Sequence, residues 1–150
     1  MTEDVIITLQ GFQQDETEEG GEPVEVVTPG KYYRRNGQHY LFFEEAMEGF
    51  PEKTRNIFKF SDRRLLVHRK GLINAEMLFE ADRRTITSYE SPMGRMQIGI
   101  AATGFSLEEE EHRISYGVDY SMNINDGYAA DCHIALSIQP RGSWSISGMQ

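Results

Sequence analysis

The sequence alternates between apolar and polar residues with a period of two over much of its length. Residues 113–125 show this best: the even positions from Ile114 to Ile124 are apolar or aromatic, and the odd positions are small or polar. A strand places successive side chains on opposite faces, whereas a helix repeats every 3.6 residues. The pattern predicts a half-buried strand, and it recurs in residues 5–9, 96–102 and 128–138.

Turn residues separate about ten such runs. Asn36-Gly37 and Asp126-Gly127 are pairs that two-residue type I′ hairpins prefer, because both central residues need positive φ. Pro29 falls inside a run, so that strand is expected to bend or to lie at an edge there. The acidic stretches 15–21 and Glu108–Glu111 are expected to be solvated loops, or one helical turn in the second case. The predicted strands cover residues 4–12, 23–34, 38–46, 53–60, 64–70, 74–81, 84–91, 94–106, 113–125 and 127–139.

Many short strands with short connections are typical of an up-and-down barrel or a sandwich. Hairpin follows hairpin without a crossover-length connection, which favours the barrel. We therefore expect an all-β fold with little helix: an antiparallel up-and-down β-barrel of about 8–10 strands. A chain of 150 residues can bury one sizeable core. We expect a single domain over residues 1–140 and a flexible tail over residues 141–150.

Charge and cysteine usage limit the partners and the compartment. The chain has 15 Lys and Arg against 24 Asp and Glu, a net charge of −9, which argues against nucleic acid and against anionic membrane surfaces. The lone Cys132 cannot form an intramolecular disulfide, which favours a reducing compartment. The start of the chain is acidic and its apolar run is too short for a secretory signal. We expect a cytoplasmic protein.

Several segments occur in an order and spacing that is informative as a set, although each position is weak alone. They are Gly30-Lys31-Tyr32-Tyr33, Tyr40-Leu41-Phe42-Phe43-Glu44-Glu45, Lys53-Thr54, Val67-His68-Arg69-Lys70-Gly71, Tyr89 and Gly94. In this order they resemble the YwiB-like family, a bacterial family of unknown function, and the resemblance extends from about residue 4 to about residue 139. It implies a calycin-like barrel, the architecture of lipocalins, and it implies no reaction.

Two charged residues share strand faces with apolar neighbours. Arg69 lies at alternate positions with Leu65 and Val67, so the three share one strand face. Glu44 shares a face with Phe42 in the same way, although the other face of the Glu44 strand is also apolar. A buried charge is costly unless it is paired. We therefore hypothesise that Arg69 and Glu44 point inward and meet each other or a ligand. The pair could close one barrel end, anchor a ligand or take part in catalysis.

The remaining candidates are aromatic. Tyr116 and Tyr120 have inward parity, and together with Tyr89 they could line a ligand site or simply pack in the core. Cys132 has inward parity and is interpreted as a core residue, whereas His68 and His133 have outward parity. No zinc spacing, phosphate loop or serine elbow is present, so we predict no metal, no cofactor and no catalytic residue.

Three functions remain open. The first is the binding of a small apolar or amphipathic ligand, with Glu44, Arg69, Tyr89, Tyr116 and Tyr120 as candidate contacts. The second is a scaffold or interaction barrel, including a homodimer formed through an exposed strand edge. The third and least favoured is an enzyme that uses Glu, Arg and Tyr inside the barrel. The pairs Arg34-Arg35, Arg63-Arg64 and Arg83-Arg84 lie at loop ends and would form a basic rim if they converged.

Overall fold

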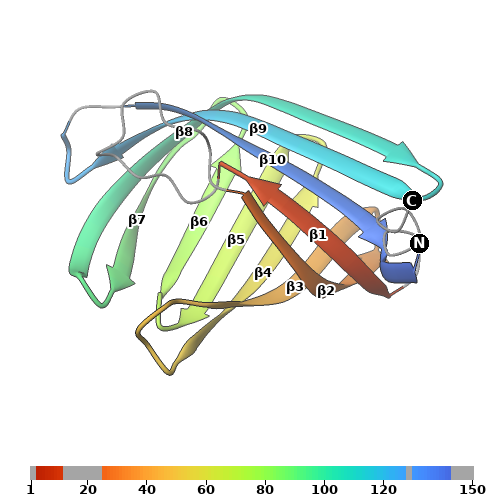
Figure 1. The fold of residues 1–150 in the computed structure, drawn as a ribbon. Coiled ribbons are helices and arrows are strands. Elements are labelled where there is room, and N and C mark those ends of the chain that lie inside the picture. The colour runs from red at the N-terminus through yellow and green to blue at the C-terminus, as the bar shows by residue number, and fades with distance from the viewer. Residues whose placement is uncertain (1–2, 12–24, 128–129, 143–150) are drawn as a thin grey trace.

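Ten antiparallel strands form one sheet that curls into a nearly closed barrel (Figure 1). The structure is a computed structural model that describes residues 3–11, 25–127 and 130–142. The strands are β1 (Asp4–Gln10), β2 (Glu25–Arg35), β3 (Gln38–Ala46), β4 (Lys53–Ser61), β5 (Arg64–Gly71), β6 (Ala75–Glu80), β7 (Arg84–Ser91), β8 (Gly94–Glu110), β9 (Arg113–Ile124) and β10 (Ala130–Pro140).

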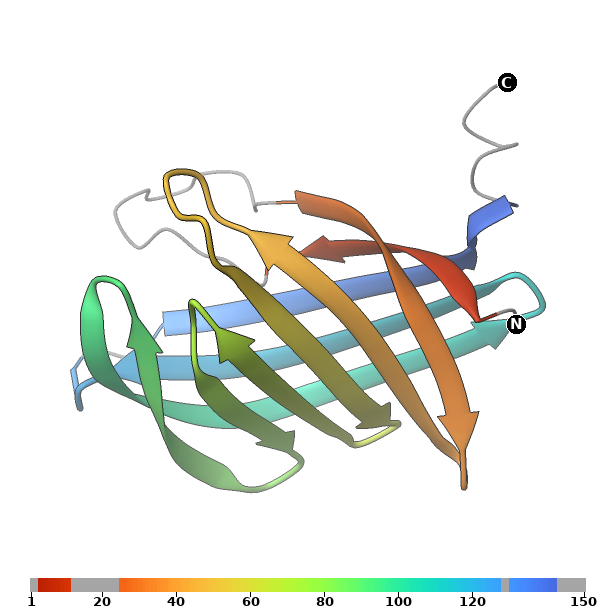
Figure 2. The same cartoon turned by 90° about the horizontal axis from the view of Figure 1, so that it is seen from below.

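The strand order is that of a meander. The sheet runs β6-β5-β4-β3-β2-β1-β10-β9-β8-β7, so every neighbouring pair is consecutive in sequence except β1 and β10. Figure 2 shows β2 to β6 crossing in front of the layer formed by β1, β10, β9 and β8. The predicted antiparallel up-and-down barrel is confirmed, and the strand boundaries mostly lie within a few residues of those expected.

The turns agree with the sequence in one place and differ in two. Asn36 and Gly37 have φ of 53° and 75°, as the predicted type I′ hairpin between β2 and β3 requires. The turn after β9 lies one residue earlier than expected, because Asn125 and Asp126 have positive φ and Gly127 N–H donates to the Ile124 carbonyl. The predicted loop at Glu108–Glu111 is wrong: Glu108 to Glu110 continue β8, paired with β9.

β2 turns a corner between two neighbours. Residues 25–31 pair with β1 and residues 31–35 pair with β3, so only Lys31 is paired on both sides. Pro29 pairs with Ile6 and lies where β2 has left β3, which fits the predicted bend or edge. Gly30 makes the corner feasible, because a Cβ there would come within 2.5 Å of Ile7 Cδ1 and 2.6 Å of the Phe42 carbonyl oxygen.

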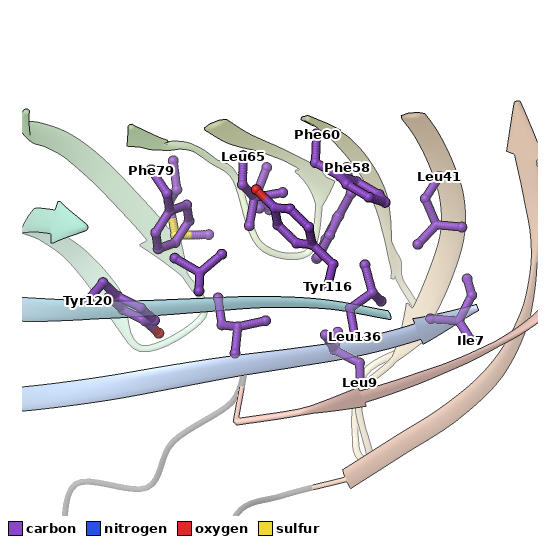
Figure 3. Close-up of a cluster of buried hydrophobic side chains, with 14 of the residues drawn as sticks. Ile7, Leu9, Leu41, Phe58, Phe60, Leu65, Phe79, Tyr116, Tyr120 and Leu136 are labelled. Carbon is purple, nitrogen blue, oxygen red and sulfur yellow. The ribbon is translucent and has the colours of Figure 1, made fainter. Parts of the chain in front are cut away.

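The barrel interior is filled by its own side chains. Phe58, Phe60, Leu65, Phe79 and Tyr116 are almost completely buried, and Figure 3 shows the labelled side chains directed toward one another between the two layers. The rings of Phe60 and Tyr116 are 4.5 Å apart, and those of Phe79 and Tyr120 are 4.9 Å apart. These rings belong to a larger apolar core, whose burial is the main stabilising contribution to the fold.

The barrel is least tightly closed between β6 and β7, which we call the seam. These strands are consecutive in sequence but are the two edges of the sheet. In the described chain, one bridge between Asn74 and Glu90 joins their far ends, and the Thr85 hydroxyl donates to the Leu78 carbonyl at 2.8 Å. The backbone between these points lacks a ladder, so the seam depends on side-chain contacts.

Two predicted segments lie outside the described residues. They are the acidic loop 15–21 and most of the tail 141–150, of which residues 141 and 142 are described. Within the part of the chain that the structure describes, no helix is long and apolar enough to cross a membrane.

Candidate functional site

Arg69 of β5 is buried at one end of the barrel, where it contacts residues from three other strands. Its side chain donates to Glu45 Oε1 at 2.5 Å, to Asn56 Oδ1 at 3.0 Å and to the Tyr89 hydroxyl at 2.9 Å. Asn56 Nδ2 also donates to Glu45 Oε1 at 2.8 Å. We call these four residues the inner network. The predicted inward orientation of Arg69 is confirmed, because the residue is 4% exposed.

The strand register explains how Arg69 reaches β7. Ala75 of β6 is its cross-strand partner, and this small side chain lets the guanidinium extend over β6 to Tyr89. No buried side-chain nitrogen or oxygen in the described residues lacks a hydrogen-bond partner. A ligand at Arg69 would therefore have to replace Glu45, Asn56 or Tyr89, and breaking such a buried pair is costly.

The predicted partner of Arg69 is wrong by one residue. Glu44 is exposed on the outer face of β3, and Glu45 points inward with Leu41 and Phe43. Both faces of β3 carry apolar side chains, so alternation alone could not choose between them. The packing decides the orientation, because Leu41 lies opposite the fully buried Phe58 of β4.

Tyr116 and Tyr120 point inward as predicted, and both are core residues. The Tyr116 hydroxyl donates to the Arg64 carbonyl at 3.1 Å, and Tyr120 lies beside the Cys132 thiol. Burial raises the pKa of both phenols. Their hydroxyls are occupied within the protein, so whether either one also contacts a ligand stays a prediction.

A second polar chain lies at the opposite end of the barrel. Tyr32 Oη is 2.7 Å from His39 Nδ1, and His39 Nε2 is 3.3 Å from Glu109 Oε1, which also accepts from Arg34 at 2.9 Å. His39 is 1% exposed and stacks on Phe60 with ring centroids 4.8 Å apart. Burial lowers the pKa of His39. This suits a neutral imidazole that accepts from Tyr32 and donates to Glu109.

The predicted basic rim is largely neutralised. Arg34 pairs with Glu109, Arg63 with Asp82, and both Arg64 and Arg83 with Glu80. Arg84 donates to the Asn123 side chain. Carboxylates and an amide thus engage these five side chains, whereas Arg35 is exposed and forms no salt bridge with a described residue. Among the described residues, no cluster of three His, Cys, Asp or Glu could hold a metal ion.

A hollow of about 650 Å³ lies outside the barrel, where β2 leaves β3, beside the outer faces of β4 and β5. We call it the outer cleft. Asn56 belongs both to its wall and to the inner network. The cleft is lined by Asp4, Pro29, Gly30, Lys31, Phe42, Phe43, Glu44, Arg55, Asn56, Ile57, His68, Lys70 and Arg141.

Sequence reasoning missed this cleft. Of the candidate residues only Glu44 lines it, and Arg69, Tyr89, Tyr116 and Tyr120 do not. The alternation in the sequence places Arg55, Ile57 and Lys70 at outward-facing positions of their strands. Their meeting depends on the β3–β4–β5 register and on the corner in β2, which no local pattern encodes.

Comparison with known proteins gives one consistent result. Residues 7–136 match a family model described as "Domain of unknown function (DUF1934)". The chain is 30% identical over 129 residues to the "Uncharacterized beta-barrel protein YwiB" of Bacillus subtilis strain 168, covering 84% of this chain and 87% of that protein. The crystal structure of the Bacillus subtilis ywiB protein is similar in fold, with a TM-score of 0.75, 20% identity and 91% of each chain covered.

Proposed function

This chain belongs to the DUF1934 family of domains of unknown function, and on that premise we propose that it is a small-molecule-binding barrel. Its ligand is apolar or amphipathic, and we assign it to the outer cleft. The calycin-like character implied by the family resemblance is part of this proposal. So is the cytoplasmic location, for which the lone Cys132 is the support.

The shape and lining of the outer cleft carry the proposal. Ligand sites typically measure roughly 300–1,000 Å³ and combine an apolar wall with a few polar groups. The cleft measures about 650 Å³, and Pro29, Phe42 and Ile57 give it an apolar wall. Ile57 is 36% exposed, so a ligand could cover it. The interior is less suitable, because aromatic core side chains fill it and the inner network engages Arg69.

A neutral fluorescent probe such as Nile red tests this proposal. We expect saturable binding, and we expect Phe42→Ser with Ile57→Ser to weaken it about tenfold or more because the apolar wall is lost. Ile86→Ser with Val27→Ser is the matched control, because both residues are exposed and neither lines the cleft. Equal losses in the two double variants would mean non-specific adsorption and would reject the outer cleft.

The seam favours a second candidate, an interaction barrel. β6 and β7 are the two edges of the sheet, and Ile86 on β7 is 59% exposed. Exposed strand edges are places where another chain can pair. Light scattering coupled to size-exclusion chromatography tests this candidate. If the seam pairs two copies, the wild-type protein is a dimer and Ile86→Lys converts it to a monomer. A monomeric wild-type protein would remove the homodimer from consideration.

A further inference from the structure

Three cations in the outer cleft form no salt bridge with a described residue. Lys31 is paired with Asp4 at 2.5 Å, and His68 lies 3.5 Å from Glu76. The other three are Arg55, Lys70 and Arg141. Arg141 interacts electrostatically with the Asp4 carboxylate, whereas Arg55 and Lys70 are the two that the proposal uses. The cleft thus gathers several positive charges in a chain whose net charge is −9.

Two of these cations face each other. Arg55 of β4 and Lys70 of β5 are direct cross-strand partners on the outer face. Like charges directly opposite in a sheet destabilise it, and an anion between them removes that repulsion. On the β3 side of β4, Glu44 is the cross-strand partner of Arg55, but the two residues form no salt bridge. The pair therefore retains its capacity to bind an anion.

An apolar row runs beside this charged row. Phe42 of β3 lies opposite Ile57 of β4, two residues along the strands from Glu44 and Arg55. Two residues of strand span about 7 Å, and residues with the same parity share one face. The face thus presents cationic groups about 7 Å from an exposed apolar strip, which matches a molecule with an anionic head and an apolar body.

We propose that the outer cleft binds a small amphipathic anion, with its head group between Arg55 and Lys70 and its apolar body across Phe42 and Ile57. This inference rests on the proposed ligand-binding function and adds the chemical class of the ligand. A carboxylate and a phosphate share the required chemistry. Arg55 can hold either one through two parallel N–H donors, and Lys70 contributes a point charge.

Calorimetric titration with matched ten-carbon probes tests the proposal. Decanoate and decyl phosphate carry the anion, decanol is neutral, and decyltrimethylammonium is a cation. We expect at least one anion to bind about tenfold or more tightly than decanol, and the cation to bind most weakly. We expect Arg55→Gln with Lys70→Gln to reduce anion affinity to about that of decanol. Raising salt from about 0.05 M to about 0.5 M should weaken only the anion.

The control removes two positive charges elsewhere. Arg35→Gln with Arg113→Gln changes exposed cations outside the cleft, at the end of β2 and the start of β9, and should leave every affinity within about twofold, because exposed charges at a distance are screened. Equal binding of decanol and both anions, or equal losses in the two double variants, would overturn the anionic ligand and leave the binding proposal standing. Failure of the ten-carbon probes and of Nile red to bind would overturn both.

Discussion

The inner network and the outer cleft lie on opposite faces of β4, and they differ in how their charged side chains are paired. Arg69 is buried with Glu45, Asn56 and Tyr89 in a set of satisfied hydrogen bonds. On the other face, Arg55 lies opposite a second cation and forms no salt bridge with any carboxylate among the described residues. A buried charge must be paired within the fold, whereas an exposed one can stay free for a ligand. The contrast supports an architectural role for the inner network and agrees with the binding role that we propose for the cleft.

The largest expected difference between the two faces concerns phenylalanine. Phe58 is completely buried, so Phe58→Ala should lower the free energy of unfolding by about 4 kcal/mol through lost burial and a cavity. Phe42→Ala on the outer face should lower it by less than about 1 kcal/mol. Urea denaturation measures both. Similar losses would mean that the cleft wall is part of the structural core.

The next-largest difference in stability is expected between substitutions of the two arginines, Arg69 and Arg55. Arg69→Met leaves the Glu45 carboxylate buried without its cation and should cost about 3 kcal/mol, again measured in urea. Arg55→Met, on the exposed face, should leave the stability unchanged or raise it slightly, because it removes the repulsion with Lys70. Adding Glu45→Leu to Arg69→Met should restore part of the loss, because it removes the unpaired charge. A mild effect of Arg69→Met alone would contradict the structural role of the inner network.

Substituting Tyr89 should have a smaller effect on stability, and this effect should be localised at the seam. Tyr89→Phe deletes the hydrogen bond from Arg69, which reaches over β6, and should cost about 1 kcal/mol. Amide hydrogen exchange should accelerate in β7 more than in β4. Tyr33→Phe is the control, because its hydroxyl bonds Glu3 at the surface. Uniform acceleration across the barrel would show that the Arg69–Tyr89 contact does not hold the seam.

The smallest effect is the pH dependence from His39. Burial and the charge of Arg34 lower its pKa below the usual 6.5, while Glu109 opposes the shift. The unfolded chain therefore binds the proton more readily, and stability should fall as pH drops below about 6.5 toward the folded pKa. Urea midpoints in that window measure the slope. His39→Gln should remove this contribution, and His133→Gln at the surface should retain it.

The sequence predicted the fold far better than the site. Alternation in residues 113–124 identified β9 and the inward direction of Tyr116 and Tyr120, because burial on one face determines residue type. The same logic failed at β3, where two apolar faces made Glu44 and Glu45 equivalent. Alternation reports a face only when the two faces differ in polarity.

The outer cleft depends on contacts between residues distant in sequence. Arg55 and Lys70 become neighbours through the register of β4 and β5, and Pro29 joins them because β2 leaves β3 at Gly30. Glu108 to Glu110 show a related limit: an acidic run typical of a loop continues as strand because β9 supplies hydrogen-bond partners. Pairing partners, rather than local propensity, decided both outcomes.

The pairing of β1 with β10 has a consequence for folding speed and for chain engineering. It is the single neighbouring pair in the sheet that is not consecutive in sequence, and Val5 lies opposite Pro140. A short linker from Pro140 to Asp4, with the chain reopened in the turn between Glu80 and Arg84, would make every neighbouring pair of strands sequential. Such a circular permutant would have a lower contact order and should fold faster than the natural connectivity.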